Sequence, residues 1–375
     1  MAAAAPGTAA TEPSASLPRP FSLYLDLCRF LAAVLVVVSH LGPYGVIAAS
    51  SANWWLNFGR ESVVLFFVLS GFVIAYTTER RNAGLRDYCI ARATRIYSVA
   101  LPLVLLGFAV AGLFVLGGRA SPGDYYQLAK PWLYLPLHLL FMGELWTISE
   151  PPPLLAPYWS LGYEVWYYVL FGAAFYLRGR RRIVVLASLL LLVGPKLWLL
   201  LPVWCAGVWL WHWQKRHAMA RPLALLGWWA TLALLVAFKT SGMDMALRNV
   251  ALSAWPFPGL PLKSADRFLA DYLVCVLVLV NFLCARSAGF TALLRIERPV
   301  RRLASYTFTL YLVHALVLRV WVKFHPGRTD LGGVALLALF IVVATWVLGQ
   351  LTEHRKEWWE RLFVRLSTGS QAAAR

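Results

Sequence analysis

The residues of this sequence that could do chemistry are ionisable side chains inside long apolar stretches. The stretch from Leu23 to Gly42 carries Arg29 and His40. At roughly 100° per residue, their spacing places them within about 20° of each other around a helix and ~16 Å apart along it. Ionisable groups are costly in lipid, so this stripe is expected to face a protein interior or a watery cavity. Asp26, three residues before Arg29, is placed to pair with it.

A second group of polar residues lies in PYWSLGYEVWYYVLF, where Glu164 follows Ser160 by four residues on the same helix face. The predicted topology places Glu164 at about the same depth as His40. A histidine and a carboxylate at equal depth can act as a general base and as the group that orients this base. This arrangement deprotonates a hydroxyl. Taken alone, His40 is also compatible with an ordinary polar residue at a helix end.

Two arginines, Arg92 and Arg95, sit three residues apart and therefore on one face of a helix that enters the third apolar stretch. One interpretation is a phosphate clamp, because the guanidinium fork matches phosphate oxygens. The other is membrane anchoring by positive charge on the cytosolic side. The sequence leaves both open.

The remaining polar candidates have structural interpretations that we favour. Ser70-Gly71 in VVLFFVLSGFVIAY is typical of close helix packing, which we prefer to a catalytic serine because no Asp/His relay accompanies it. His314 lies in mid-span with Tyr311 on the same side, and a structural, hydrogen-bonding histidine is slightly favoured over a catalytic one.

The composition excludes a soluble protein, because 60% of the residues are hydrophobic and 14% are charged. The net charge of +18 is explained by basic loops that orient membrane spans, so we expect no nucleic-acid partner. Neither a metal site nor a disulfide framework is expected, because the cysteines form no CxxC pair and mostly lie in apolar runs. The cysteines are residues 28, 89, 205, 275 and 284.

The sequence predicts an all-α polytopic membrane protein with about ten transmembrane helices and both termini in the cytosol. The predicted spans cover residues 22–41, 61–78, 97–117, 158–177, 182–199, 200–213, 222–239, 268–285, 303–322 and 332–351. If the apolar segment 132–146 does not cross, the loops on one side hold 23 Lys and Arg residues and the opposite loops hold 10. We therefore predict that 132–146 is a re-entrant or outward-facing element.

Three regions are expected along the chain. Residues 1–20 are predicted to form a disordered tail, and 21–351 a membrane domain. Residues 352–375 include a basic, tryptophan-bearing amphipathic helix that is expected to lie on the lipids of the inner leaflet.

Taken together and in this order, these motifs resemble the acyltransferase 3 family of bacterial membrane O-acyltransferases. The resemblance covers about residues 20–350. It rests on Arg29-x10-His40, the run Phe66 to Phe72, Arg92-x-x-Arg95 followed by Ile-Tyr, Trp159-Ser160-Leu-x-x-Glu164, and Tyr311-Leu-x-His314. The sequence departs from the family pattern at Ser98, where proline is common, and at Val313, where tryptophan is frequent.

The resemblance implies transfer of an acyl group, usually acetyl from acetyl-CoA, to a hydroxyl of an exported polysaccharide or lipid-linked glycan precursor in the bacterial inner membrane. Arg92 and Arg95 would hold the CoA phosphates, with the thioester passing Arg29 toward His40. His40, oriented by Glu164, would take the acceptor's proton, either directly or through an acyl-enzyme. Glycan-assembly proteins are possible partners.

Three alternatives remain at this stage. A transporter or flippase for a glycan precursor would also use intramembrane Arg and His. An acyltransferase acting on a small-molecule metabolite would use the same site. The other membrane O-acyltransferase superfamily would place the essential residue at His314 rather than His40.

Overall fold

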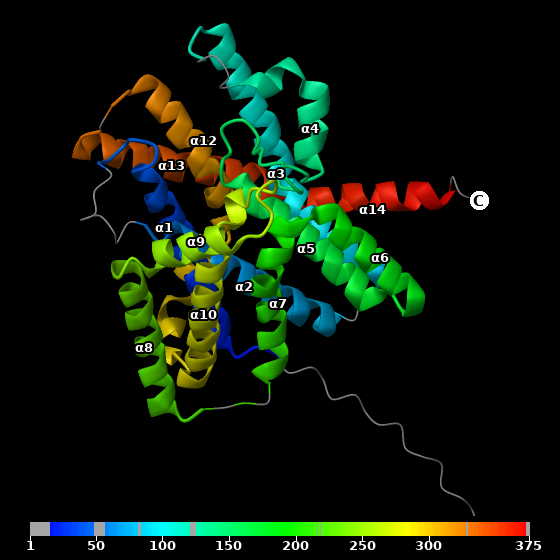
Figure 1. Cartoon of the computed structure of the whole chain (residues 1–375), viewed down its shortest axis with the longest axis vertical. Coiled ribbons are helices and arrows are strands. Elements are labelled where there is room, and N and C mark those ends of the chain that lie inside the picture. The colour runs from blue at the N-terminus through cyan, green and yellow to red at the C-terminus, as the bar shows by residue number, and fades with distance from the viewer. Residues whose placement is uncertain are drawn as a thin grey trace, which may run out of the picture.

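The computed structural model describes residues 16–48, 57–81, 84–120, 125–215, 217, 219–327 and 329–372, and every regular element in these ranges is a helix (Figure 1). The predicted all-α class is therefore confirmed. Most of the tail expected over residues 1–20 lies outside the described residues. The first helix begins at Arg19.

The longer helices are α1 Arg19–Leu41, α2 Gly59–Arg81, α3 Leu85–Leu116, α5 Tyr158–Tyr176, α6 Gly179–Val193, α7 Pro195–Trp213, α8 Arg221–Thr240, α10 Phe268–Ala288, α12 Thr307–Phe324, α13 Leu331–Leu351 and α14 Lys356–Ala372. Shorter elements are η2 Tyr126–Ala129, α4 Pro131–Leu139, α9 Met243–Ala254, η3 Lys263–Ala265, η4 Thr291–Ile296, α11 Glu297–Ala304 and η5 Glu353–Arg355.

Several of these helices can cross a bilayer, as expected for a multi-pass membrane protein. Within the described residues, seven are long and apolar enough by length and composition, or eight if α6 and α7 together form one span. The seven are α1, α2, α3, α8, α10, α12 and α13, and each corresponds to a predicted span. The other three predicted spans correspond to α5, α6 and α7.

The break between α6 and α7 lies at Gly194, where the helix direction bends by 119°. The sequence-based boundary at residue 199 was therefore misplaced by five residues. Gly194 has a φ of +80°, which favours glycine, and Pro195 occupies the first position of α7, where its missing N–H is not needed. A Cβ on Gly194 would come within 3.0 Å of the Trp146 side chain, so this turn is also closely packed.

Segment 132–146 forms the short helix α4 and the turns after it. With nine residues, α4 is only about 14 Å long, against a hydrocarbon core of ~30 Å. The polar residues of the segment are buried inside the protein: His138 bonds Gln127 at 2.8 Å, and Glu144 pairs with Lys196 at 3.1 Å. Helix α4 is thus too short to cross by itself, and a re-entrant or outward-facing position of the segment stays a prediction.

The centre of the molecule is the crossing of α2 and α7, which pack backbone against backbone. A Cβ on Gly71 would lie 2.1 Å from the carbonyl oxygen of Trp204, and one on Gly207 would lie 1.9 Å from that of Val68. Small residues allow this approach. The prediction that Ser70-Gly71 supports close helix packing is therefore confirmed for Gly71.

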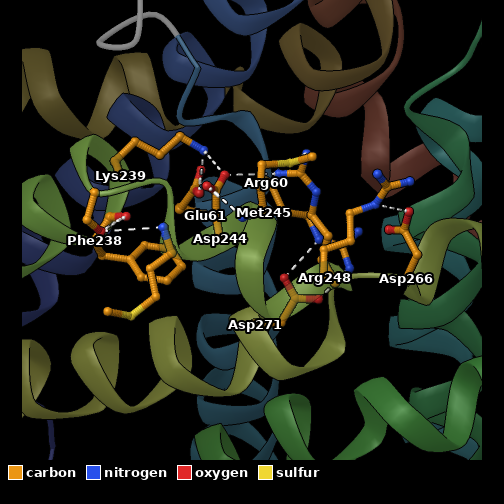
Figure 2. A network of polar contacts seen from close by, with 12 residues as sticks. Arg60, Glu61, Phe238, Lys239, Asp244, Met245, Arg248, Asp266 and Asp271 are labelled. Atoms are coloured by element: carbon orange, nitrogen blue, oxygen red, sulfur yellow. Dashed lines mark hydrogen bonds and ion pairs between the residues drawn. The ribbon is translucent and has the colours of Figure 1, made fainter. Parts of the chain in front are cut away.

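Helices α7, α8 and α10 stand side by side (Figure 1), and α8 and α10 are joined to α2 and α9 by a buried network of ion pairs. Figure 2 shows Lys239 of α8 reaching Glu61 of α2 at 2.8 Å and Asp244 of α9 at 3.1 Å. Nearby, Arg60 of α2 donates from Nε to Asp271 of α10 at 2.9 Å. Because buried charges need partners, this network fixes four helices relative to one another.

Candidate active site

A cavity of about 230 Å³ opens between α1, α2, α3, α5, α12 and the short helix η5. Its walls combine apolar residues with an unusual number of ionisable ones. The charged and hydroxyl-bearing lining residues are Arg29, Ser70, Thr77, Arg92, Arg95, Ser160, Glu164, Tyr168, Thr307, Tyr311 and Glu353. Seven of the ten predicted site residues therefore line one cavity, although they come from five different helices.

Three arginines give this cavity its positive wall. Arg29 is held by Asp26 at 3.0 Å, as the i, i+3 spacing predicted, and by the carbonyl oxygen of Ala304 at 3.1 Å. Arg92 and Arg95 of α3 form no ion pair with any carboxylate in the described part of the chain. The Nε atoms of Arg29 and Arg92 are buried without a hydrogen-bond partner. The cavity therefore offers guanidinium donors to an anionic ligand.

Glu164 also lines this cavity, and hydroxyl groups hold its carboxylate. It accepts a hydrogen bond from Ser70 Oγ at 2.7 Å and another from the Tyr168 hydroxyl. The indole of Trp204 donates to Ser70 Oγ at 3.2 Å. Ser70 and Tyr168 therefore hold the carboxylate of Glu164, and Trp204 of α7 holds Ser70 in place.

Ser160 and Tyr311 connect the cavity to the next group of polar residues. Their hydroxyl oxygens lie 2.6 Å apart, which joins α5 to α12. One turn further along α12, the ring centroid of His314 lies 6.3 Å from that of Tyr311 in an edge-on arrangement. Tyr311 thus belongs to the cavity lining and also contacts His314.

His314 and His40 form a pair between α12 and α1. His314 Nε2 lies 3.4 Å from His40 Nδ1, and the ring centroids are 5.1 Å apart. His40 Nδ1 is 2.7 Å from the carbonyl oxygen of Val36, and His314 Nδ1 is 3.1 Å from that of Leu310. A carbonyl only accepts, so both Nδ1 atoms carry the proton. The single Nδ1–H of His40 points to the Val36 carbonyl, and the longer approach of His314 Nε2 is a weaker second branch of the same bond, so His40 Nε2 keeps its lone pair free of these contacts.

The structure corrects the expected pairing of His40 with Glu164. Within the described residues, His40 bonds Val36 and His314, whereas Glu164 bonds Ser70 and Tyr168. Equal depth in the membrane does not determine which way each side chain points around its helix axis. Glu164 points toward α2, and the orienting groups of His40 are a backbone carbonyl and a second histidine.

Trp159, like His40 and His314, lies apart from the cavity lining. The guanidinium of Arg60 stacks over its ring at 5.1 Å, and its ring packs edge-on against Tyr163 at 5.5 Å. Trp159 therefore joins α5 to the ion-pair network of Figure 2 through Arg60.

Two ionisable cavity residues, Tyr168 and Glu353, were missed by the sequence-based reasoning. Tyr168 follows Glu164 by four residues, so helical periodicity could have identified it as a partner. Glu353 lies after the last apolar stretch and accepts hydrogen bonds from Thr309, 44 positions earlier. Nothing local in the sequence indicates that contact. Over the described residues, no group of three or more His, Cys, Asp or Glu side chains is arranged to hold a metal ion.

Comparison with known proteins identifies the chain's relatives. A family model described as an acyltransferase domain matches residues 22–350. The exopolysaccharide production protein ExoZ of Rhizobium meliloti (strain 1021) is 27% identical over 150 residues, which are 38% of this chain and 43% of that protein. The chain therefore matches less than half the length of this curated relative. No solved structure matches. Because the family model covers most of the sequence, the chain belongs to the acyltransferase 3 family of membrane O-acyltransferases.

Proposed function

We propose that this protein transfers an acetyl group from acetyl-CoA to a hydroxyl of an exported polysaccharide or a lipid-linked glycan precursor. The observation that carries the proposal is the arginine-lined cavity with the His40–His314 pair next to it, joined to its lining by the contact of Tyr311 with His314. An anion-binding wall and a histidine with a free lone pair are the two parts that acyl transfer from an acyl-CoA to an alcohol requires.

Arg92, Arg95 and Arg29 are the proposed donor-binding residues. CoA carries a diphosphate and a 3′-phosphate, and guanidinium groups bind such oxygens in pairs. The absence of paired carboxylates on Arg92 and Arg95 within the described residues supports this role. In the proposed topology, with ten spans and both termini cytosolic, these arginines face the cytosolic donor and the histidine pair lies toward the outer surface.

His40 is the proposed general base. Its Nε2 lone pair takes the proton of the acceptor hydroxyl, and the acceptor oxygen forms the new C–O bond at the acyl carbon. The thioester C–S bond breaks, and CoA leaves as the thiolate, which then receives the proton. Protonated His40 is stabilised by the Val36 carbonyl and by His314 Nε2. The same base serves direct transfer and an acyl-enzyme route.

Glu164 is proposed to act at the cavity rather than on His40. Its carboxylate is held by Ser70 and Tyr168, and Glu164 lines the same cavity as the arginines and Tyr311. There it can accept a hydrogen bond from an amide of the pantetheine arm. Ser160 and Tyr311 complete that wall of the proposed channel.

A glycan acceptor is proposed from two lines of support. The family resemblance implies sugar hydroxyls as acceptors, and the matched relative is named for exopolysaccharide production. We accordingly propose a location in the bacterial inner membrane, where exported glycans are assembled, with glycan-assembly proteins as possible partners.

The test uses purified full-length protein in lipid nanodiscs with acetyl-CoA labelled in the acetyl group. We expect label to appear on a lipid-linked glycan acceptor, and His40→Ala to lower the rate by about 10²–10⁴-fold, the usual contribution of a general base. Wild-type transfer by His40→Ala would exclude it as the base. Label that never leaves acetyl-CoA, in a preparation that moves glycan across the bilayer, would favour the transporter alternative. Mass spectrometry of surface polysaccharide with and without the gene identifies the acceptor.

A further inference from the structure

The chain that follows α13 contributes to the cavity although it lies beyond the matched residues 22–350. After η5, helix α14 continues away from the end of α13 and packs along α3 (Figure 1). The ring of Phe363 in α14 lies 6.0 Å from that of Tyr97 in α3. This contact places the tail against the helix that carries Arg92 and Arg95.

Glu353 extends from this tail into the arginine-lined cavity. Its Oε2 atom accepts hydrogen bonds from the backbone N–H of Thr309 at 3.2 Å and from Thr309 Oγ1 at 3.0 Å. No ion pair joins it to Arg29, Arg92 or Arg95 in the described part of the chain. The carboxylate is therefore fixed to α12, with its charge facing the cavity beside the arginines.

The tail also lines a second hollow, of about 400 Å³, whose walls include Glu360 and Val364 of α14. This hollow shares two residues, Thr77 and Arg92, with the first cavity. Arg92 thus lies where the two spaces meet, and the tail contributes to both. A ligand long enough to occupy both would contact the tail at each end.

We propose that Glu353 sets the affinity for the anionic donor, as a fixed negative charge that weakens phosphate binding at the arginine wall. This inference rests on the proposed function, in which the cavity binds acyl-CoA. Like charges a few ångströms apart in a partly buried site repel one another strongly. Without Glu353, the three arginines would hold both acyl-CoA and the product CoA more tightly. Its charge therefore favours release of CoA after each transfer.

The test compares wild type with Glu353→Gln, which removes the charge but keeps an oxygen for Thr309. Equilibrium binding of CoA to the purified full-length protein is measured by titration calorimetry. We expect the Kd for CoA to fall about tenfold, a change typical for one nearby charge. The KM for S-acetylpantetheine, a neutral thioester donor without phosphates, is expected to stay within twofold of wild type. An unchanged or weaker CoA affinity overturns the proposal.

Matched controls separate charge from folding. Glu357→Gln removes the same charge from an exposed position on the same tail, and it is expected to leave the CoA affinity unchanged. Glu353→Asp keeps the charge and should bind CoA as wild type does, within about threefold. Glu353→Ala must change the affinity in the same direction as Glu353→Gln. Opposite shifts in the two neutral variants mean that the residue acts through packing, which overturns the proposal.

Failure of this inference is distinguishable from failure of the proposed function. If CoA binds wild type and Arg92→Ala weakens that binding, the donor assignment holds. An unchanged CoA affinity in Glu353→Gln then overturns only the role of Glu353. If wild type binds no CoA, the donor assignment and the role of Glu353 fall together.

Discussion

At the scale of single residues, the histidine pair defines the roles of both its members. The carbonyl oxygens of Val36 and Leu310 fix the proton of each ring on Nδ1, so the lone pair available to a substrate is that of His40 Nε2. The Nε2 atom of His314 is engaged with His40, and its ring packs against Tyr311 of the cavity lining, although neither histidine lines the cavity itself. We therefore assign His314 to positioning and reserve proton transfer for His40.

Replacing His314 with alanine should lower kcat about tenfold and leave the KM for acetyl-CoA unchanged, because one hydrogen bond to the charged form of His40 is lost. Steady-state kinetics on the purified protein measures this split. His314→Gln, whose amide oxygen can accept from His40 Nδ1–H, should recover most of the rate. If His314→Ala abolishes turnover while His40→Ala keeps it, His314 is the essential histidine, as in the other membrane O-acyltransferase superfamily.

Replacing Arg92 with alanine should raise the KM for acetyl-CoA tenfold or more, since a charge-assisted bond to phosphate contributes roughly 1.5–3 kcal/mol. The KM for S-acetylpantetheine is the internal control, because that donor has no phosphate to lose. Equal increases in KM for acetyl-CoA and for S-acetylpantetheine would mean that Arg92 only anchors α3 in the membrane.

At the scale of elements, the crossing of α2 and α7 positions Ser70 beside Glu164. The approach is permitted by Gly71 and Gly207, whose missing side chains leave room for the carbonyl oxygens of the partner helix. Trp204, on the same face of α7, donates to Ser70. Any displacement of α7 from α2 must therefore also disturb the donors that hold Glu164.

Gly207→Ala should destabilise the protein by about 1–3 kcal/mol, because its Cβ meets the backbone of α2, which cannot move aside without separating the helices. Thermal unfolding monitored by fluorescence-detected size exclusion should show a lower Tm. Gly112→Ala, in α3 with open space around the position of the added carbon, is the control and should leave the Tm near wild type. A similar fall in Tm for Gly207→Ala and Gly112→Ala would show that the close crossing of α2 and α7 does not limit stability.

At the scale of the whole molecule, the apolar runs predicted where most helices lie, because spanning length and hydrophobicity are local properties of sequence. Neighbouring residues on one helix were also predictable, as with Asp26 and Arg29. Contacts between residues on different helices could not be predicted from the sequence. Depth alone suggested His40 beside Glu164, whereas helix rotation, set by packing, gives them different partners. The contact of Glu353 with Thr309 depends on the fold of the tail.

The proposed topology, with ten spans and both termini cytosolic, is tested by reporter fusions. A fluorescent protein fused after residue 180 or at the C-terminus should fluoresce, and alkaline phosphatase at the same sites should be inactive, because the positive-inside bias holds these basic segments in the cytosol. Fusions near residue 258 should give the reverse result. Active phosphatase after residue 180 would mean that segment 132–146 crosses the membrane.

The sharp turn at Gly194 also has a consequence for how the chain enters the membrane. Helix α6 has 15 residues, so it is about 22 Å long and shorter than the ~30 Å hydrocarbon core. Trp146 donates to the carbonyl oxygens of Val193 and Leu191 at 3.3 Å and 2.9 Å, which fastens the turn to the segment before α5. We expect α6 and α7 to insert together as a hairpin during synthesis, after the segment that holds their tip is already in place.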